Sequence, residues 1–259
     1  MKFIRTYGKT LLFFGIIGLI GGFFTGIYAL NSYPEATKQQ LIAEINAAGL
    51  NILPIEIALG LITAVQSVGY GIILGAIGIM LGKKIGTWKD EHSLTFKPLT
   101  ASIAVAVAGG LAMILSDIMF FGKYSDAIMN SYATKPTIPY LIATVTYGAV
   151  IEEVILRLFV MSLVAFILHM LFERKEEKTS VGVLIIANVI SSILFAAGHL
   201  PATAESIGLT PIIVLRCFIL NGGIGLLFGR LYRKYGLRYS MIAHGGCHIV
   251  SKIIWILFI

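Results

Sequence analysis

Long apolar stretches separated by short polar loops make up most of this chain. A helix needs about 20 apolar residues to cross roughly 30 Å of hydrocarbon, and seven stretches reach or approach that length. They cover residues 10–30, 54–81, 99–121, 139–171, 181–200, 211–228 and 239–259. The pattern predicts an all-α fold, a polytopic membrane helix bundle with about seven transmembrane helices. The fourth stretch is over-long, so we expect it to tilt or to continue beyond the bilayer as a helix.

Composition agrees with this pattern and removes several classes of function. Hydrophobic residues make up 57% of the 259 positions and charged residues only 13%, against about a quarter in an average soluble domain. This excludes a soluble enzyme and a disordered regulator. The net charge of +7 does not indicate nucleic-acid binding, because no basic stripe interleaved with exposed aromatic residues accompanies it. We therefore expect the lipid bilayer, and no nucleic acid, as a partner.

The basic residues indicate which loops face the cytoplasm. Cytoplasmic loops carry an excess of Lys and Arg, and here the N-terminus and the second, fourth and sixth loops hold most of them. The other loops hold only Lys38, Lys123 and Lys135. This alternation predicts a cytoplasmic N-terminus and an outer C-terminus. The short loops and compact size favour a multi-pass protein of a bacterial plasma membrane.

Ionisable residues inside the predicted spans concentrate in three places, all in the last 110 residues. The first is Glu152-Glu153 followed by Arg157 in the fourth span. On an α-helix Glu153 and Arg157 share one face, whereas Glu152 points about 100° away. Arg157 can then neutralise Glu153, which leaves Glu152 as a spare carboxylate suited to proton transfer. The alternative is a buried charge cluster that only holds helices together.

The other two places hold histidines. His199 ends the run Phe195-Ala-Ala-Gly-His199 and, taken alone, is more typical of an interfacial residue than of a catalyst. His244 and His248 are four residues apart on the last span, so their imidazoles share a helix face. Such a pair could bind a metal, donate hydrogen bonds to an oxyanion or bridge helices. Counting along the spans puts His199 near the outer face and His244 near the cytoplasmic loop, so they meet only if helices tilt or the sixth loop enters the membrane.

The three places together are more specific than any of them alone. In order along the chain they read EExxxR, FxxxH and HxxxH, on the fourth, fifth and seventh stretches, between about residues 140 and 255. This resembles the CPBP/Abi family of intramembrane proteases, which includes the type II CAAX prenyl endopeptidases and bacteriocin-immunity proteins. The resemblance implies a catalytic core in residues 136–259, preceded by transmembrane helices without a motif in residues 1–135. His248 departs from the family pattern, which has Asn or Asp there.

The resemblance also implies a mechanism of peptide hydrolysis. Glu152 would act as general base on a water that His199 positions or polarises, while His244 and His248 stabilise the oxyanion. The second Glu and the Arg of the first motif would orient the helix and balance its charge. The expected substrate is a membrane-associated or lipidated protein or peptide.

The sequence leaves alternatives open for both the cofactor and the wider function. The family pattern implies no cofactor, but Glu152, His199, His244 and His248 could also form a zinc site, which His248 makes more plausible. A catalytically silent protein of the same fold, serving as a bacteriocin-immunity factor or a signalling scaffold, is the first alternative. A transporter with a proton relay is the second, and the lack of internal repeats counts against it.

Overall fold

The computed structural model describes residues 2–49, 52–90 and 93–259 and confirms the all-α prediction. Within those residues, seven helical segments are long and apolar enough to cross a membrane. They are Lys2–Leu30, Ile55–Ile85, Phe96–Lys123, Ile138–Phe172, Val181–Ile207, Pro211–Tyr235 and Leu237–Phe258. Each overlaps one predicted stretch, so the chain is a multi-pass membrane protein. The side of the membrane on which the N-terminus lies stays a prediction.

Several spans are built from more than one helical element. The α-helices are α1 (Lys2–Ser32), α2 (Glu35–Ala47), α3 (Ile55–Gly69), α4 (Gly75–Ile85), α5 (Phe96–Met119), α6 (Asp126–Asn130), α7 (Ile138–Ala143), α8 (Ser162–Phe172), α9 (Val181–Ile207), α10 (Pro211–Cys217), α11 (Gly223–Tyr235) and α12 (Leu237–Phe258). A short 3₁₀ turn, η2 (Phe121–Lys123), follows α5. The π-helical segments are η1 (Tyr70–Leu74), η3 (Thr144–Glu152), η4 (Val154–Met161) and η5 (Phe218–Gly222).

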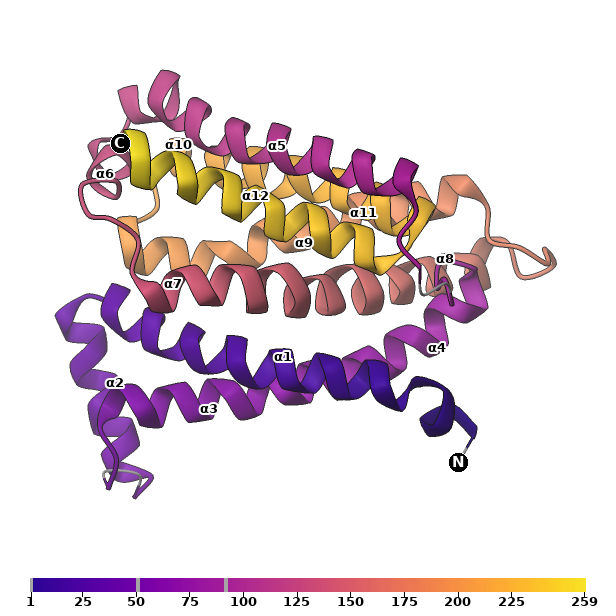
Figure 1. Cartoon of the computed structure of the whole chain (residues 1–259), viewed down its shortest axis with the longest axis horizontal. Helices are drawn as coiled ribbons and strands as arrows, with labels where there is room; N and C mark the ends of the chain where they lie inside the picture. Colours follow the sequence, from indigo (N-terminus) through magenta and orange to yellow (C-terminus); the bar gives the residue numbers. More distant parts are fainter. Residues whose placement is uncertain (1, 50–51, 91–92) are drawn as a thin grey trace.

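The span from α7 to α8 runs through the middle of the bundle (Figure 1). On one side it contacts α1 and α4, and on the other it contacts α9 and α12, while α5 packs along α12. Val154, Leu158 and Met161 of η4 are fully buried in the largest apolar cluster, which also contains Phe14 and Tyr232. The segment that carries the first motif is therefore covered by helices on both sides.

Small residues let α1 and α3 approach closely, as is typical of helices that pack in lipid. A Cβ atom on Gly18 would lie 2.6 Å from the backbone oxygen of Ser67. A Cβ on Gly26 would lie 2.6 Å from the backbone oxygen of Leu59. Alanine at either position would force the two helices apart.

Large apolar side chains cover the outer faces of the spans. Val65 on α3 is 72% exposed, and Ile186 on α9 and Ile253 on α12 are about half exposed. Contiguous apolar surface of this kind is rare on soluble monomers and marks contact with lipid or another protein. The outward faces thus agree with a bilayer environment.

The fourth span differs from the α-helix that the sequence spacing assumed. Residues 144–152 and 154–161 wind as π-helix on either side of Glu153. In a π-helix the backbone bonds reach five residues back, so the widened turns change which side chains share a face. The 100° angle between Glu152 and Glu153 therefore does not apply here. Long π-helical segments are rare and frequently lie at functional sites.

His199 lines one small cavity with His244 and His248 of the last helix, although counting along the spans placed His199 and His244 near opposite ends. The fourth span has 35 residues and the fifth has 27, and the connection between α8 and α9 projects beyond the ends of neighbouring helices (Figure 1). The fourth helical segment is over-long, as the sequence indicated, and whether it tilts or continues beyond the bilayer stays a prediction.

Candidate active site

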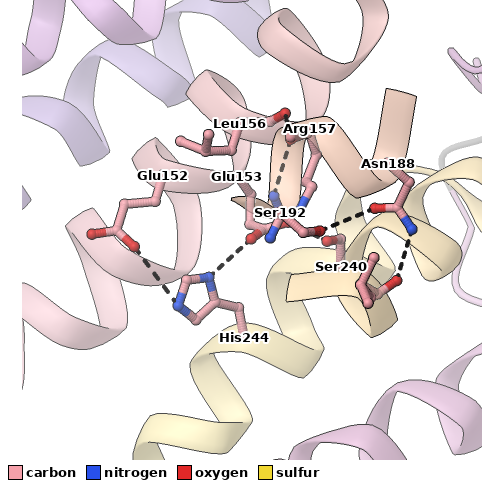
Figure 2. Close-up of polar contacts among 10 residues, drawn as sticks. Glu152, Glu153, Leu156, Arg157, Asn188, Ser192, Ser240 and His244 are labelled. Atoms are coloured by element: carbon pink, nitrogen blue, oxygen red, sulfur yellow. Dashed lines mark hydrogen bonds and ion pairs between the residues drawn. The ribbon is translucent and has the colours of Figure 1, made fainter. Parts of the chain in front are cut away.

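The buried carboxylate of Glu153 lies at the centre of the site (Figure 2). Glu153 is fully buried, and its Oε1 accepts a hydrogen bond from Nδ1 of His244 at 3.0 Å. Its Oε2 accepts a hydrogen bond from the Ser240 hydroxyl. These contacts tie the fourth span to α12. A carboxylate on Nδ1 fixes the orientation of the imidazole and directs Nε2 away from Glu153.

Glu152 approaches the same imidazole from its other nitrogen. The distance from its Oε2 to Nε2 of His244 is 3.9 Å, and its side chain is 21% exposed. His244 therefore lies between two carboxylates (Figure 2), one fully buried and one partly open. A water molecule can bridge two polar atoms at this separation.

Arg157 joins the fourth span to α9 and is completely buried. Its Nε lies 3.6 Å from Oε2 of Glu153, and its Nη1 donates to the Ser191 hydroxyl at 3.2 Å. The guanidinium also lies over the ring of Phe195, 4.9 Å from the ring centre. The expected ion pair with Glu153 is present. The shorter contacts of Glu153 are with Ser240 and His244 of α12, and the sequence spacing did not indicate them.

The ring of His244 is held between two other rings. It stacks on Phe228 at 4.6 Å and 22°, and on His248 at 5.0 Å and 30°. Offset stacking of this kind restricts the imidazole to one plane. Two carboxylates and two stacked rings thus position a single side chain.

His199 and His248 complete the set of histidines. Nδ1 of His199 lies 2.8 Å from the backbone oxygen of Phe195. A carbonyl oxygen only accepts, so Nδ1 carries the proton and Nε2 of neutral His199 keeps a free lone pair. Nδ1 of His248 is buried and has no hydrogen-bond partner among the described residues.

A small cavity brings these histidines together. It has a volume of about 30 Å³, and its lining includes His199, His244, His248 and Phe195. That volume is sufficient for at least one water molecule. Neither Glu152 nor Glu153 is in the lining, but Glu153 is hydrogen-bonded to His244 and Glu152 lies 3.9 Å from Nε2 of that residue. Five of the six predicted residues are thus in or next to one cavity, and Arg157 supports it from behind Phe195.

The side chains as placed do not form a zinc site. Zinc takes four ligands at about 2.0–2.3 Å around one point. Within the described ranges, no group of three or more His, Cys, Asp or Glu side chains is arranged to hold a metal ion. Nδ1 of His244 is bonded to Glu153, and its ring is stacked on that of His248. We therefore assign no step to a metal.

Sequence reasoning missed the polar residues that support the motif. Ser240 lies one turn before His244 on the same face of α12, so the spacing of four could have indicated it. On α9, Ser192 donates to the side-chain oxygen of Asn188 at 3.4 Å, and Asn188 donates to the backbone of Leu226 at 2.9 Å (Figure 2). These bonds connect α9 with α11 beneath Arg157. The spacing of four could also have indicated the Ser192–Asn188 pair, whereas no local spacing predicts the bond from Asn188 to Leu226.

Intramembrane charge also extends beyond the three expected places, which corrects that prediction. Asp117 on α5 is fully buried, and both its oxygens accept hydrogen bonds at 2.5 Å from Arg216 on α10. Lys252 on α12 is 7% exposed. The first two partners are separated by 99 residues, so their pairing could not be read from local spacing.

Comparison with known proteins gives one result. Residues 134–250 match the family model described as type II CAAX prenyl endopeptidase Rce1-like. The comparisons with curated proteins and with solved structures found no match. The matched range contains all three motifs, from Glu152 to His248. Residues 134–250 are therefore similar to the Rce1-like type II CAAX prenyl endopeptidases, which agrees with the resemblance that the motifs indicated.

Proposed function

We propose that this protein is an intramembrane endopeptidase that hydrolyses a peptide bond of a membrane-associated or lipidated protein or peptide. The single observation that carries the proposal is the position of His244 between Glu153 and Glu152. It supplies a fixed imidazole and a second, more open carboxylate beside a water-sized cavity. The family match adds that related chains are peptidases. We place the protein in a bacterial plasma membrane, as its short loops suggest.

Glu152 is the proposed general base. A water between Oε2 of Glu152 and Nε2 of His244 would contact both atoms, given their separation of 3.9 Å. Glu152 takes one proton from this water as the water oxygen attacks the scissile carbonyl carbon. The same proton then passes to the leaving nitrogen, so the carboxylate is regenerated when the peptide bond breaks.

The histidines have complementary roles in this proposal. His199 uses its free Nε2 to accept a hydrogen bond from the attacking water. Protonated His244 donates from Nε2 to the oxyanion, and His248 contributes the second imidazole of the same cavity. Glu153 is a positioning residue, because it acts on the reaction only through His244. Arg157 balances the charge of Glu153.

The surroundings of the cavity favour this chemistry. Met113, Leu220, Ile224 and Phe228 line it together with the histidines. Apolar walls exclude bulk water and strengthen the interaction of the fixed donors with a developing negative charge.

The proposal is tested by cleavage in liposomes. Wild type, Glu152→Gln and Glu152→Ala would each be given a mixed panel of membrane and lipidated peptides, with products identified by mass spectrometry. Loss of the general base should lower the rate by about 10²- to 10⁴-fold. Glu56→Gln makes the same chemical change on an exposed residue of α3 and serves as the control.

Equal cleavage by wild type and both Glu152 variants would show that another group is the base or that a contaminant is responsible. No cleavage by wild type, with a biological phenotype that survives Glu152→Ala, would favour the catalytically silent alternative.

A further inference from the structure

The face of α12 that carries the two histidines continues to a buried lysine. Ser240, His244, His248 and Lys252 follow one another at intervals of four, so they form one stripe along the helix. Lys252 lies about 6 Å beyond His248 along the helix axis. Its side chain is only 7% exposed. The proposed mechanism uses His244 and His248 of this stripe and gives Lys252 no role.

Lys252 has no acidic partner among the residues that the structure describes. Asp117, the nearby buried acid, is occupied by a bidentate contact with Arg216 and accepts a further hydrogen bond from Tyr132 at 2.6 Å. The ammonium of Lys252 instead lies over the ring of Tyr140, at 4.7 Å from the ring centre. Aromatic faces hold a cation but do not neutralise it.

A cavity opens in front of this ammonium. It has a volume of about 780 Å³, within the range of ligand sites, and Lys252, Arg216 and Lys135 are among its lining residues. None of the described residues in the lining is Asp or Glu. Several are hydroxyl residues, including Ser131, Thr137, Ser206 and Ser251. The cavity thus combines an unpaired deep cation with neutral hydrogen-bonding groups, which suits a single negative charge.

This cavity adjoins the candidate active site. Met113 lines both cavities, and the Ser251 hydroxyl donates to the backbone oxygen of His248 at 3.0 Å. A ligand held at Lys252 would therefore extend along α12 toward the histidines.

We propose that the cavity at Lys252 is a substrate subsite that binds a carboxylate of the peptide to be cleaved. The choice of a peptide as ligand rests on the proposed function. A carboxylate accepts charge-assisted hydrogen bonds from an ammonium. The Thr137 hydroxyl in the lining accepts from the backbone N–H of Tyr140, so its own proton is available for the second carboxylate oxygen. The position on the histidine stripe favours a substrate group over a lipid phosphate. The carboxylate belongs to the chain terminus or to an acidic side chain.

Binding can be measured without turnover. The chain has two tryptophans, and Trp255 lines the cavity, so Trp88→Phe leaves Trp255 as the only tryptophan reporter. The probes are acetyl-trileucine as free acid and as amide, and the amidated peptides acetyl-Leu-Glu-Leu and acetyl-Leu-Gln-Leu. Each is titrated in phosphatidylcholine liposomes, and the titrations are repeated with phosphatidylglycerol added.

At least one acidic probe should bind about tenfold more tightly than its neutral counterpart, as expected for a charge-assisted hydrogen bond. The pair that shows this preference identifies the source of the carboxylate. Lys252→Met should abolish the preference. Lys123→Met, an exposed lysine outside the cavity lining, should retain it. Lys252→Arg keeps the charge and should restore part of the preference.

Three results would overturn the inference: no preference in wild type, a preference that survives in Lys252→Met, or a Trp255 response to phosphatidylglycerol alone. Removing an unpaired buried cation leaves no orphaned acid, so Lys252→Met should unfold at or above the wild-type temperature. If it does not fold, Lys252→Gln replaces it under the same criteria. A protein that cleaves no peptide yet shows the preference would refute the proposed function and the substrate role of the cavity, but it would retain carboxylate binding at Lys252.

Discussion

Removal of the Glu153 charge is the perturbation whose effect the structure defines best. Glu153→Gln keeps the size of the side chain and still offers an oxygen to Nδ1 of His244. It removes the negative charge that faces Arg157, whose Nε and Nη2 have no hydrogen-bond partner among the described residues. Arg157 would then be a buried cation without its adjacent counter-charge.

Burial decides the size of this effect. Breaking a buried ion pair by removing one partner costs about 3–5 kcal/mol, because an uncompensated charge remains in a low-dielectric site. Both side chains of the Glu153–Arg157 pair are 0% exposed, so we expect a loss of that order. The double variant Glu153→Gln/Arg157→Met removes both charges and should recover most of the stability. Its cleavage activity should stay low, since the imidazole of His244 has lost its carboxylate.

The assay is thermal unfolding in detergent, combined with peptide cleavage. The matched control is Asp90→Asn, because Lys83 and Asp90 also lie 3.6 Å apart but their side chains are 48% and 59% exposed. This surface pair should contribute little. Wild-type stability of Glu153→Gln, or a double variant no more stable than the single one, would refute the assignment of Glu153 as counter-charge to a buried Arg157.

Three further predictions concern other parts of the molecule. A Cβ on Gly148 would lie 3.3 Å from Nε2 of His248, so Gly148→Ala should displace that imidazole and slow cleavage while the unfolding temperature changes little. Purified active protein should contain less than one zinc per chain and keep its activity in 1,10-phenanthroline; stoichiometric zinc whose removal abolishes cleavage would contradict the metal-free proposal. Hydrogen bonds from Ser180 lower the pKa of Glu173 below its usual range, so the contact is present at neutral pH and is lost as pH falls through that lowered value. Hydrogen exchange at the Ser180 amide is measured across pH in wild type and in Glu173→Gln. The wild-type amide should be protected at neutral pH and should lose this protection in acid. Equal exchange rates in both proteins at every pH would contradict this.

The spans and the motif residues could be predicted because each depends on local information. A run of apolar residues long enough to cross a bilayer identifies a helix without knowledge of its neighbours. Glu152, Glu153 and Arg157 lie within one span, and His244 and His248 lie on one helix face. Their spacing was therefore visible in the sequence.

The contacts between spans could not be predicted in the same way. The π-helical winding around Glu153 changes the directions in which the neighbouring side chains point. No residue pattern in that stretch predicts this winding. That His199 lines one cavity with His244 and His248 depends on how α9 packs in the bundle, which span lengths alone do not determine. Ser240 and Arg216 find their acidic partners 87 and 99 residues away. Such pairings depend on helix packing.

The most direct test of the account is cleavage of a peptide panel in liposomes prepared with heavy-oxygen water. Wild type should yield a product whose new carboxylate carries one heavy oxygen, because hydrolysis adds the oxygen of a water molecule to the scissile carbonyl carbon. Glu152→Gln should yield little product, and Glu56→Gln should match wild type. Equal product from wild type and Glu152→Gln, or product without heavy oxygen, would contradict a protease in which Glu152 activates water.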